Sequence, residues 1–141
     1  MAGREAPKKK PSVVFVCVAN SFRSQMAEGA ARARVRDRWE IWSAGSHPSG
    51  VVHPRAIQSM AEVGVDLRGQ RSKGLADLPV REWDLVVTMG CGDACPMLRA
   101  KRRLDWDLPD PDLQGDDGIR RVRDRILALV EELCRESDSA G

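Results

Sequence analysis

A cysteine and an arginine six positions apart are the residues of this sequence best placed to do chemistry. Cys17 lies in a short apolar run, residues 13–18, which follows Pro11 and is typical of a buried strand. Arg23 comes near the start of residues 21–38, whose Ala, Arg, Gln, Met and Glu content predicts a helix. A loop between strand and helix directs backbone N–H groups and the positive end of the helix dipole at one point, which favours a bound oxyanion and a thiolate. We therefore expect Cys17 to be an ionised nucleophile and Arg23 to grip two oxygens of a tetrahedral anion.

The composition predicts one globular domain. A chain of 141 residues with 42% apolar content can bury one core, and a net charge of +2 gives no reason to expect a nucleic acid or a membrane as partner. The first apolar stretch is too short for a signal peptide or a membrane span, so we expect a cytoplasmic protein, in which structural disulfides are uncommon. We expect residues 1–11 to be a disordered basic tail, residues 12–136 to be the catalytic domain, and residues 137–141 to be a flexible tail.

Strands and helices alternate along the rest of the chain. Further strands are expected at residues 40–44, 84–89 and 103–106, and further helices at residues 53–64 and 119–133. This alternation predicts an α/β fold: a single domain with a four-stranded, parallel, doubly wound sheet and helices on both faces. Ligands of such sheets bind beyond the carboxyl ends of the strands, so Cys17 and Cys91 are expected on the same rim.

Two more cysteines, Cys91 and Cys95, stand four positions apart in Cys-Gly-Asp-Ala-Cys-Pro. The glycine between them loosens the backbone, so that the two thiols could close a small disulfide and cycle between redox states. A zinc site is an alternative, although no second pair of ligands stands at a zinc-finger spacing, and incidental core thiols are another.

The remaining candidates are an acid and three residues for which structural roles are expected. Asp110 precedes Pro111, which keeps it out of helical geometry in a surface loop, and it could protonate an oxygen that leaves a bound anion. An ordinary acidic turn is the alternative. Cys134 is expected to be a packing or surface thiol, and His47 and His53 are expected in a turn and at a helix start.

Together these residues resemble the thioredoxin-coupled arsenate reductases, which share the fold and anion loop of the low-molecular-weight protein tyrosine phosphatases. The resemblance covers the chain from about residue 12 to residue 133. It is most specific in Cys-Val-Ala-Asn-Ser-Phe-Arg-Ser-Gln-Met-Ala-Glu-Gly at residues 17–29, in Trp-Ser-Ala-Gly at residues 42–45, and in residues 86–96 and 106–111.

The resemblance implies a reaction at the loop. Cys17 would attack arsenate, Asp110 would protonate the departing hydroxide, and Ser24 would support the Cys17 thiolate with a hydrogen bond. The remaining oxygens would be held by Arg23 and by the backbone amides of the substrate-binding residues Val18, Ala19, Asn20, Ser21 and Phe22.

The resemblance also implies a thiol relay. Cys91 would attack Cys17 and expel arsenite, and Cys95 would then attack Cys91, leaving a disulfide for thioredoxin to reduce. Gly90 and the short spacing from Cys91 to Cys95 depart from the family pattern. A Cys17–Cys95 path, or resolution by glutathione, mycothiol, bacillithiol or a glutaredoxin-type reductant, therefore remains open.

Cofactors, oligomeric state and rival functions complete the expectations. No cofactor is required, but some relatives bind potassium beside the loop, at positions that match Asn20, Glu28, Ser43 and Asp66. We expect a monomer. The rival enzyme is a tyrosine phosphatase that uses only Cys17, Arg23 and Asp110, although the chain has no Tyr and only 4% aromatic residues to stack on a substrate ring. A thiol module that senses arsenic or redox state is the non-enzymatic alternative.

Overall fold

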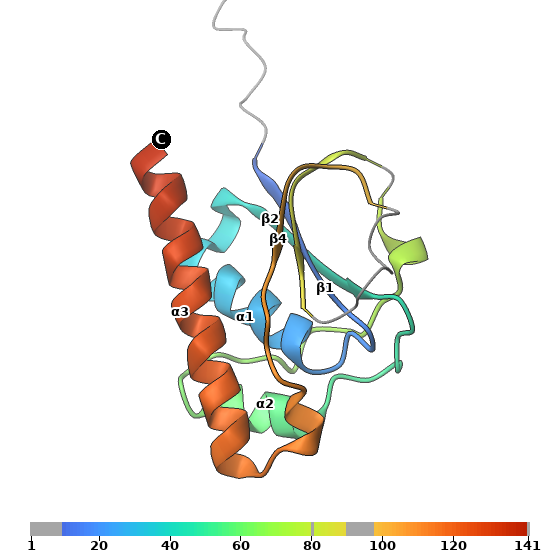
Figure 1. Ribbon diagram of the computed structural model, residues 1–141, viewed down its shortest axis with the longest axis vertical. Helices are drawn as coiled ribbons and strands as arrows, with labels where there is room; N and C mark the ends of the chain where they lie inside the picture. Colours follow the sequence, from blue (N-terminus) through green and yellow to red (C-terminus); the bar gives the residue numbers. More distant parts are fainter. Residues whose placement is uncertain (1–9, 80, 90–97, 141) are drawn as a thin grey trace, which may run out of the picture.

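Four parallel strands form one sheet, in the spatial order β2-β1-β3-β4 (Figure 1). The computed structural model describes residues 10–79, 81–89 and 98–140. The strands are β1 (Ser12–Cys17), β2 (Glu40–Gly45), β3 (Trp83–Thr88) and β4 (Ala100–Asp105). Strand β1 lies between β2 and β3, so the strand that ends at Cys17 is paired on both sides. The parallel four-stranded sheet expected from the sequence is confirmed.

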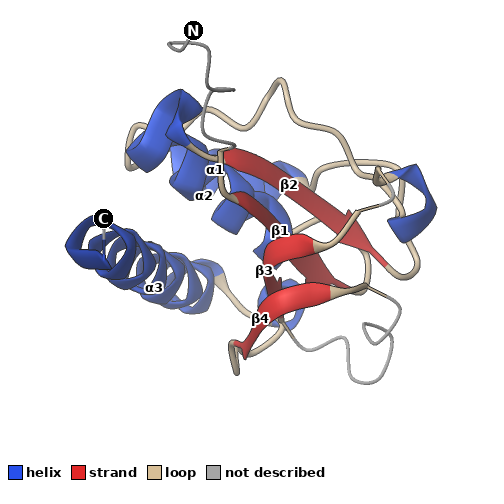
Figure 2. Ribbon diagram, turned by 90° about the horizontal axis from the view of Figure 1, so that it is seen from above, coloured by secondary structure: helices blue, strands red, loops and turns tan. Residues whose placement is uncertain are grey.

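Three α-helices pack against one face of this sheet (Figure 2). They are α1 (Arg23–Val35), α2 (Pro54–Ala61) and α3 (Asp116–Ala140). Alternate strand residues point to this face, because successive side chains of a strand face opposite sides. These residues join apolar side chains of all three helices in one core: Val13, Phe15, Leu85 and Val87 from the sheet, and Met26, Ala27, Met60, Ile119 and Ile126 from the helices.

The other face of the sheet has a thinner cover. Val14 and Val16 of β1 pack there with Trp83 and Leu78, beside the short 3₁₀ helix η3 (Leu75–Asp77). The sequence predicts helices on both faces of the sheet. Within the described part of the chain, η3 is the only helix that packs on this second face. The segment before it, residues 46–73, instead runs back toward the end of β1, as its contacts with the loop after β1 show.

The last helix is longer than the sequence pattern predicts. Two aspartates, Asp116 and Asp117, lie in its first turn, where their charge is stabilised by the helix dipole. An ion pair within the helix, from Arg135 to Glu131 at 3.1 Å, supports its carboxyl-terminal part. Residues 137–140 therefore continue α3 rather than forming a separate tail, whereas residues 1–9 of the expected basic tail lie outside the described residues. No described helix is both long and apolar enough to cross a membrane.

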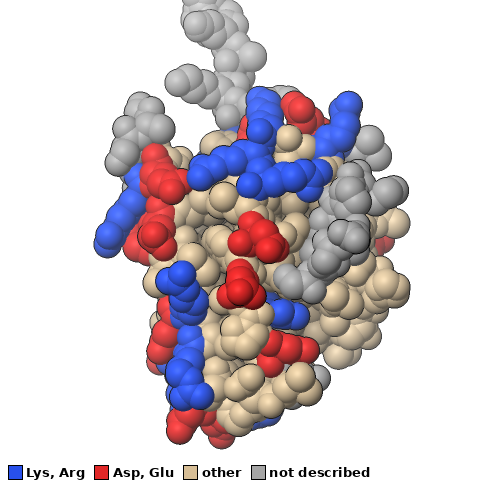
Figure 3. Space-filling model, in the orientation of Figure 1, with Lys and Arg blue, Asp and Glu red and all other residues tan. Residues whose placement is uncertain are grey.

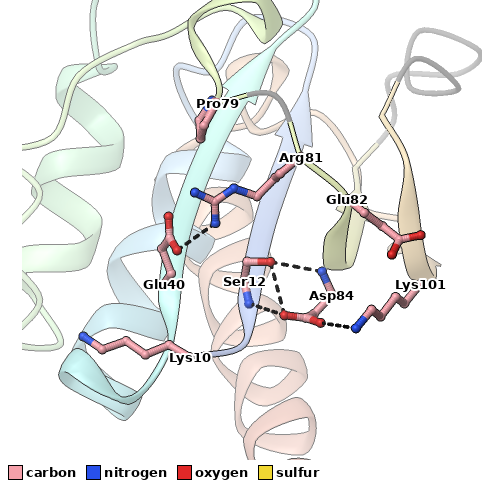
Figure 4. A pocket seen from close by; sticks show the side chains of 8 residues that line it. All are labelled: Lys10, Ser12, Glu40, Pro79, Arg81, Glu82, Asp84 and Lys101. Atoms are coloured by element: carbon pink, nitrogen blue, oxygen red, sulfur yellow. Dashed lines mark hydrogen bonds and ion pairs between the residues drawn. The ribbon is translucent and has the colours of Figure 1, made fainter. Parts of the chain in front are cut away.

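Paired charges line a hollow at the amino ends of the strands (Figure 4). The carboxylate of Asp84 accepts hydrogen bonds from the backbone N–H and hydroxyl of Ser12, at 2.8 and 3.2 Å, and Lys101 Nζ lies 3.4 Å from it. Beside them, Arg81 donates to Glu40 at 2.7 Å, and this hydrogen bond is the main cause of the lowered pKa of Glu40. These contacts fix where β1, β2 and β3 begin, at the opposite end of the sheet from Cys17.

Charged side chains also protect the outer edge of the sheet. Strand β4 lies at the edge and carries three consecutive exposed basic residues, Lys101, Arg102 and Arg103. Basic side chains gather in this region of the surface, and both acidic and basic side chains lie along α3 (Figure 3). Lysine and arginine on an edge strand oppose strand pairing with another chain along this edge.

An ion-pair clasp joins α2 to α3. Glu62 follows α2, and its carboxylate accepts hydrogen bonds from Arg120, at 2.9 and 3.0 Å, and from Arg123, at 2.7 Å. Arg123 also donates to the backbone carbonyl of Ser59, at 3.0 Å. The Arg120 guanidinium, followed by that of Arg123, lowers the pKa of Glu62 from 4.5 to about 2.

We predict that Glu62→Gln lowers stability in a pH-dependent way. A carboxylate with a lowered pKa stabilises the folded state above its unfolded-state value of 4.5, and this contribution disappears as the pH falls toward about 2. Urea unfolding at several pH values should therefore show a small gap between wild type and variant near pH 7 that closes on acidification. Glu132→Gln is the control, because no described ion pair includes Glu132. A gap that stays constant down to the acid limit would contradict the clasp.

Candidate active site

The central strand delivers Cys17 to the edge of the sheet, and α1 begins six residues later. Cys17 pairs in register with Gly45 of β2, and only 2% of its surface is exposed. Residues 18–22 have no regular secondary structure, and the segment 17–23 is called the anion loop below. The loop therefore lies at the carboxyl ends of the strands, where a parallel sheet binds its ligands.

The backbone of the anion loop leaves its amide groups available. Asn20 has a left-handed backbone conformation with φ of 46°, which asparagine adopts more readily than most residues. Three N–H groups of the following segment bind loop carbonyls at 2.8–3.0 Å: those of His47, Ser49 and His53 donate to Val18, Ala19 and Ser21. Among the described residues, no hydrogen bond uses the backbone N–H groups of residues 19–22. Free N–H groups at a helix amino terminus form an oxyanion site.

The loop residues differ in what they can present to a ligand. Val18 is 40% exposed, and Ala19 and Ser21 are partly buried. The side chains of Asn20 and Phe22 are buried, and the Phe22 ring lies 4.6 Å from the imidazole of His53. Asn20 and Phe22 can therefore contribute only backbone groups to a bound anion.

A hydroxyl group lies next to the cysteine sulfur. Ser24 Oγ is 2.9 Å from Cys17 Sγ, and it accepts a hydrogen bond from Asn20 Nδ2 at 2.8 Å. Since Asn20 supplies the hydrogen on one side of Ser24, the serine hydrogen is available for the sulfur. A hydroxyl that donates to sulfur favours the thiolate, which is the nucleophilic form.

The side-chain amide of Asn20 is held from all sides. Its Nδ2 group also donates to Ser43 Oγ at 2.9 Å, while its Oδ1 accepts from the backbone N–H of Lys73 at 2.7 Å and from Gln25 Nε2 at 2.9 Å. Donors therefore meet the amide oxygen, and hydroxyl groups meet the amide nitrogen. The orientation of the amide follows from these partners.

Arg23 reaches toward the loop that carries Asp110. Its NH1 donates to the backbone carbonyl of Leu108 at 3.1 Å, which places the guanidinium two residues from Asp110. Asp110 is exposed and directly precedes the 3₁₀ helix η5 (Pro111–Leu113). The structure thus brings Cys17 and Ser24 together, and Arg23, the first residue of α1, contacts the segment that carries Asp110.

The other two predicted thiols, Cys91 and Cys95, lie outside the described residues. Met89 is the last residue described before them, and its N–H donates to the carbonyl of Val16 at 2.8 Å. Strand β3 therefore ends beside the strand that carries Cys17. Cys134 of α3, in contrast, is buried in the core, and His53 caps α2 by accepting from the N–H of Arg55, both as expected.

The expected potassium ligands do not come together. Asn20, Glu28 and Ser43 form one hydrogen-bonded cluster, but Asp66 is exposed and both its carboxylate oxygens bind Arg68. Arg68 lowers the pKa of Asp66 to about 2. In the cluster, the ammonium of Lys73 lies 3.6 Å from Glu28. Among the described residues, no group of three His, Cys, Asp or Glu side chains could hold a metal ion.

Comparison with known proteins agrees with this geometry. Residues 12–139 match the model of the low molecular weight phosphotyrosine protein phosphatase family. The chain belongs to this family. An arsenate reductase of Staphylococcus aureus (strain Newman) is 38% identical over 126 residues, which cover 86% of this chain and 95% of the relative. The resemblance to arsenate reductases seen in the sequence is thereby confirmed.

Solved structures of arsenate reductases share the fold. A structure of an arsenate reductase in the phosphate-binding state is 38% identical, with a TM-score of 0.82 over 89% of this chain and 98% of that chain. The thioredoxin-dependent arsenate reductase of Corynebacterium glutamicum is 35% identical, with a TM-score of 0.82 over 99% of this chain and 67% of that chain.

Sequence reasoning missed three residues that shape the loop. Gln25 donates to the backbone carbonyls of Asn20 and Arg71, at 3.1 and 2.9 Å, and Lys73 lies on the same side of the loop. Gly45 packs directly against the loop backbone. A Cβ atom at this position would lie 2.5 Å from the Val18 carbonyl oxygen and 2.8 Å from the Asn20 backbone nitrogen. Gln25 lies within the family motif of residues 17–29, but no local pattern points to Lys73.

We predict that Gly45→Ala distorts the anion loop. The added methyl group would meet backbone atoms, which cannot move aside without displacing Val18 and Asn20. Phosphate should bind at least about tenfold more weakly, because N–H groups that are displaced lose hydrogen bonds of about 1.5 kcal/mol or more to a charged ligand. Isothermal titration calorimetry with inorganic phosphate measures this loss.

Gly69→Ala provides the matched control, because a Cβ atom at Gly69 has no atom within 4 Å. Unchanged phosphate binding by Gly45→Ala would show that β2 does not shape the loop.

Proposed function

We propose that this chain is an arsenate reductase that uses Cys17 as its nucleophile and takes electrons from a cytoplasmic dithiol such as thioredoxin. The observation that supports this most directly is the Ser24 hydroxyl, 2.9 Å from Cys17 Sγ, at the start of a loop with free N–H groups. The similarity to named arsenate reductases supports the choice of arsenic over phosphorus as the central atom.

The first step is an attack on arsenate. The Cys17 thiolate forms a bond to arsenic while a hydroxide leaves, and Asp110 supplies the proton that turns it into water. Arg23 and the loop N–H groups neutralise the remaining oxygens as charge develops on them. Arsenic is still pentavalent in the resulting Cys17 adduct, so no electrons have yet been transferred.

The second step is the reduction, and it needs another thiol. A Cys91 thiolate attacks Cys17 Sγ, the sulfur–arsenic bond breaks, and its electron pair leaves with arsenic as trivalent arsenite. Cys95 then attacks Cys91, which frees the Cys17 thiolate and leaves a Cys91–Cys95 disulfide. The reductant dithiol returns two electrons to this disulfide and completes the cycle.

The surface around the loop suits a small anion better than a phosphorylated tyrosine. All six aromatic residues lie in the described part of the chain and are buried or partly buried, and Phe22 and Trp106 are only 6% and 7% exposed. A tyrosine phosphatase would benefit from an exposed ring to stack on its substrate. The exposed apolar side chains near the loop are instead aliphatic, such as Val18.

We predict arsenate-dependent NADPH consumption in the presence of thioredoxin and its reductase. Cys17→Ser should reduce the rate by at least about a thousandfold, because it removes the nucleophile. Cys91→Ser should also stop multiple turnover, whereas it should leave hydrolysis of phenyl phosphate, which needs only Cys17 chemistry, unchanged.

Cys134→Ala is the matched control, because Cys134 belongs to α3, is buried in the core, and should be dispensable for turnover. Hydrolysis of phenyl phosphate without NADPH consumption on arsenate would identify a phosphatase. Oxidation of the thiols with a single turnover only would identify a sensor.

A further inference from the structure

Glu28 is a buried carboxylate one helical turn beyond the anion loop. It is 3% exposed, and it lies on α1 facing β2. Ser43 Oγ donates to its Oε1 at 2.5 Å, and Arg32 Nε donates to its Oε2 at 2.9 Å. A buried carboxylate remains charged only where cationic or hydrogen-bonding partners compensate it. The partners of Glu28 therefore decide the direction of the hydrogen bonds made by the groups that contact it.

Lys73 is the more buried of the two cations beside Glu28. Its Nζ lies 3.6 Å from Glu28 Oε1 and donates to the backbone carbonyl of Arg71 at 2.8 Å. Only 15% of the Lys73 side chain is exposed, whereas half of the Arg32 side chain is exposed. The backbone N–H of Lys73 is bound to Asn20 Oδ1, so both ends of this residue are fixed beside the loop.

A chain of hydrogen bonds runs from Glu28 to the nucleophile, and its direction is set at Glu28. An ionised Glu28 can only accept, so Ser43 must donate to it and offers a lone pair to Asn20 Nδ2. The second N–H of Asn20 goes to Ser24 Oγ. The Ser24 hydrogen is then directed to Cys17 Sγ.

The same place does not suit a potassium ion. Asn20 turns its nitrogen, not its oxygen, toward Ser43 and Glu28, and the carboxylate of Asp66 is bound to Arg68. A metal cation next to Glu28 Oε1 would also be repelled by the ammonium of Lys73 at 3.6 Å. The charge that a cation would bring is already present in the chain.

We propose that Lys73 is a positioning residue whose ammonium acts as the built-in cation of the anion loop: it compensates the charge of the buried Glu28 carboxylate and thereby holds the Ser24 hydrogen on Cys17, without any need for potassium. This inference deepens the proposed function, because it rests on Cys17 being the nucleophile of that reaction.

The test is the rate at which iodoacetamide alkylates Cys17 near neutral pH, followed by peptide mass spectrometry on the full chain. Lys73→Ala should lower this rate about tenfold and shift its pH profile upward, because Cys17 loses part of its thiolate. Ammonium or potassium chloride should restore the rate relative to choline chloride at the same ionic strength, since a small cation can enter the vacated space. The wild type should respond equally to all three salts.

Arg68→Ala is the matched control. It removes the same charge from the same segment, but Arg68 pairs with the exposed Asp66 and not with Glu28. Its alkylation rate should equal that of the wild type in every salt.

Three results would overturn the proposal: a wild type stimulated specifically by potassium, a Lys73→Ala variant as reactive as the wild type, or a slower variant that no small cation restores. The readout does not involve arsenate. The expected alkylation pattern without arsenate reduction would therefore refute the proposed function and leave the role of Lys73 intact.

Discussion

The side-chain amide of Asn20 connects the nucleophile to the rest of the fold. Its two N–H groups bind the hydroxyls of Ser24 and Ser43, and its oxygen accepts from Gln25 and from the Lys73 backbone. An asparagine side chain has two donors and two acceptor positions, and here each has a partner. A rotation of the amide would leave several buried polar groups unpaired at once, which is costly. One orientation of the Ser24 hydrogen follows from this constraint.

The sheet makes this arrangement possible by bringing separate segments to the same edge. Strand β1 supplies Cys17, and its neighbour β2 supplies both Ser43 and the small Gly45 on which the loop rests. Helix α1 supplies Ser24, Gln25 and Glu28, all of which are buried. The polar groups thus form a compact layer between helix and sheet, where the low dielectric constant strengthens each hydrogen bond.

Local sequence patterns predict much of the fold, and they predict the strand and helix on either side of the anion loop. The β-branched run before Cys17 predicts a buried strand, because a strand covered on both faces is apolar throughout. The strand–loop–helix order predicts that Cys17 ends a strand and that a helix begins near Arg23, and the structure has both. The apolar pattern predicts a shorter α3 than the structure has. The last turns of the helix are polar, and ion pairs such as Arg135–Glu131 support them instead of an apolar stripe.

The role of Lys73 could not be predicted in this way. It is 45 residues from Glu28 in the sequence, and only the path of the segment after α2 brings the two charges together. Resemblance to the family places Asp66 at the cation site by residue type alone. A neighbouring arginine, Arg68, binds both of its carboxylate oxygens, and residue type alone does not reveal such a local pairing.

The central claim is that Cys17 forms a bond to the arsenic of a bound arsenate, and that a second thiol then attacks the Cys17 sulfur. The electron pair of the sulfur–arsenic bond leaves with arsenic, which is thereby reduced. The most direct test mixes the fully reduced chain with arsenate in the absence of any reductant, then counts arsenite and free thiols. The account predicts one arsenite per chain and the loss of two of the four cysteine thiols, with Cys17 free again. Retention of all four thiols, or arsenite formation without thiol loss, would contradict it.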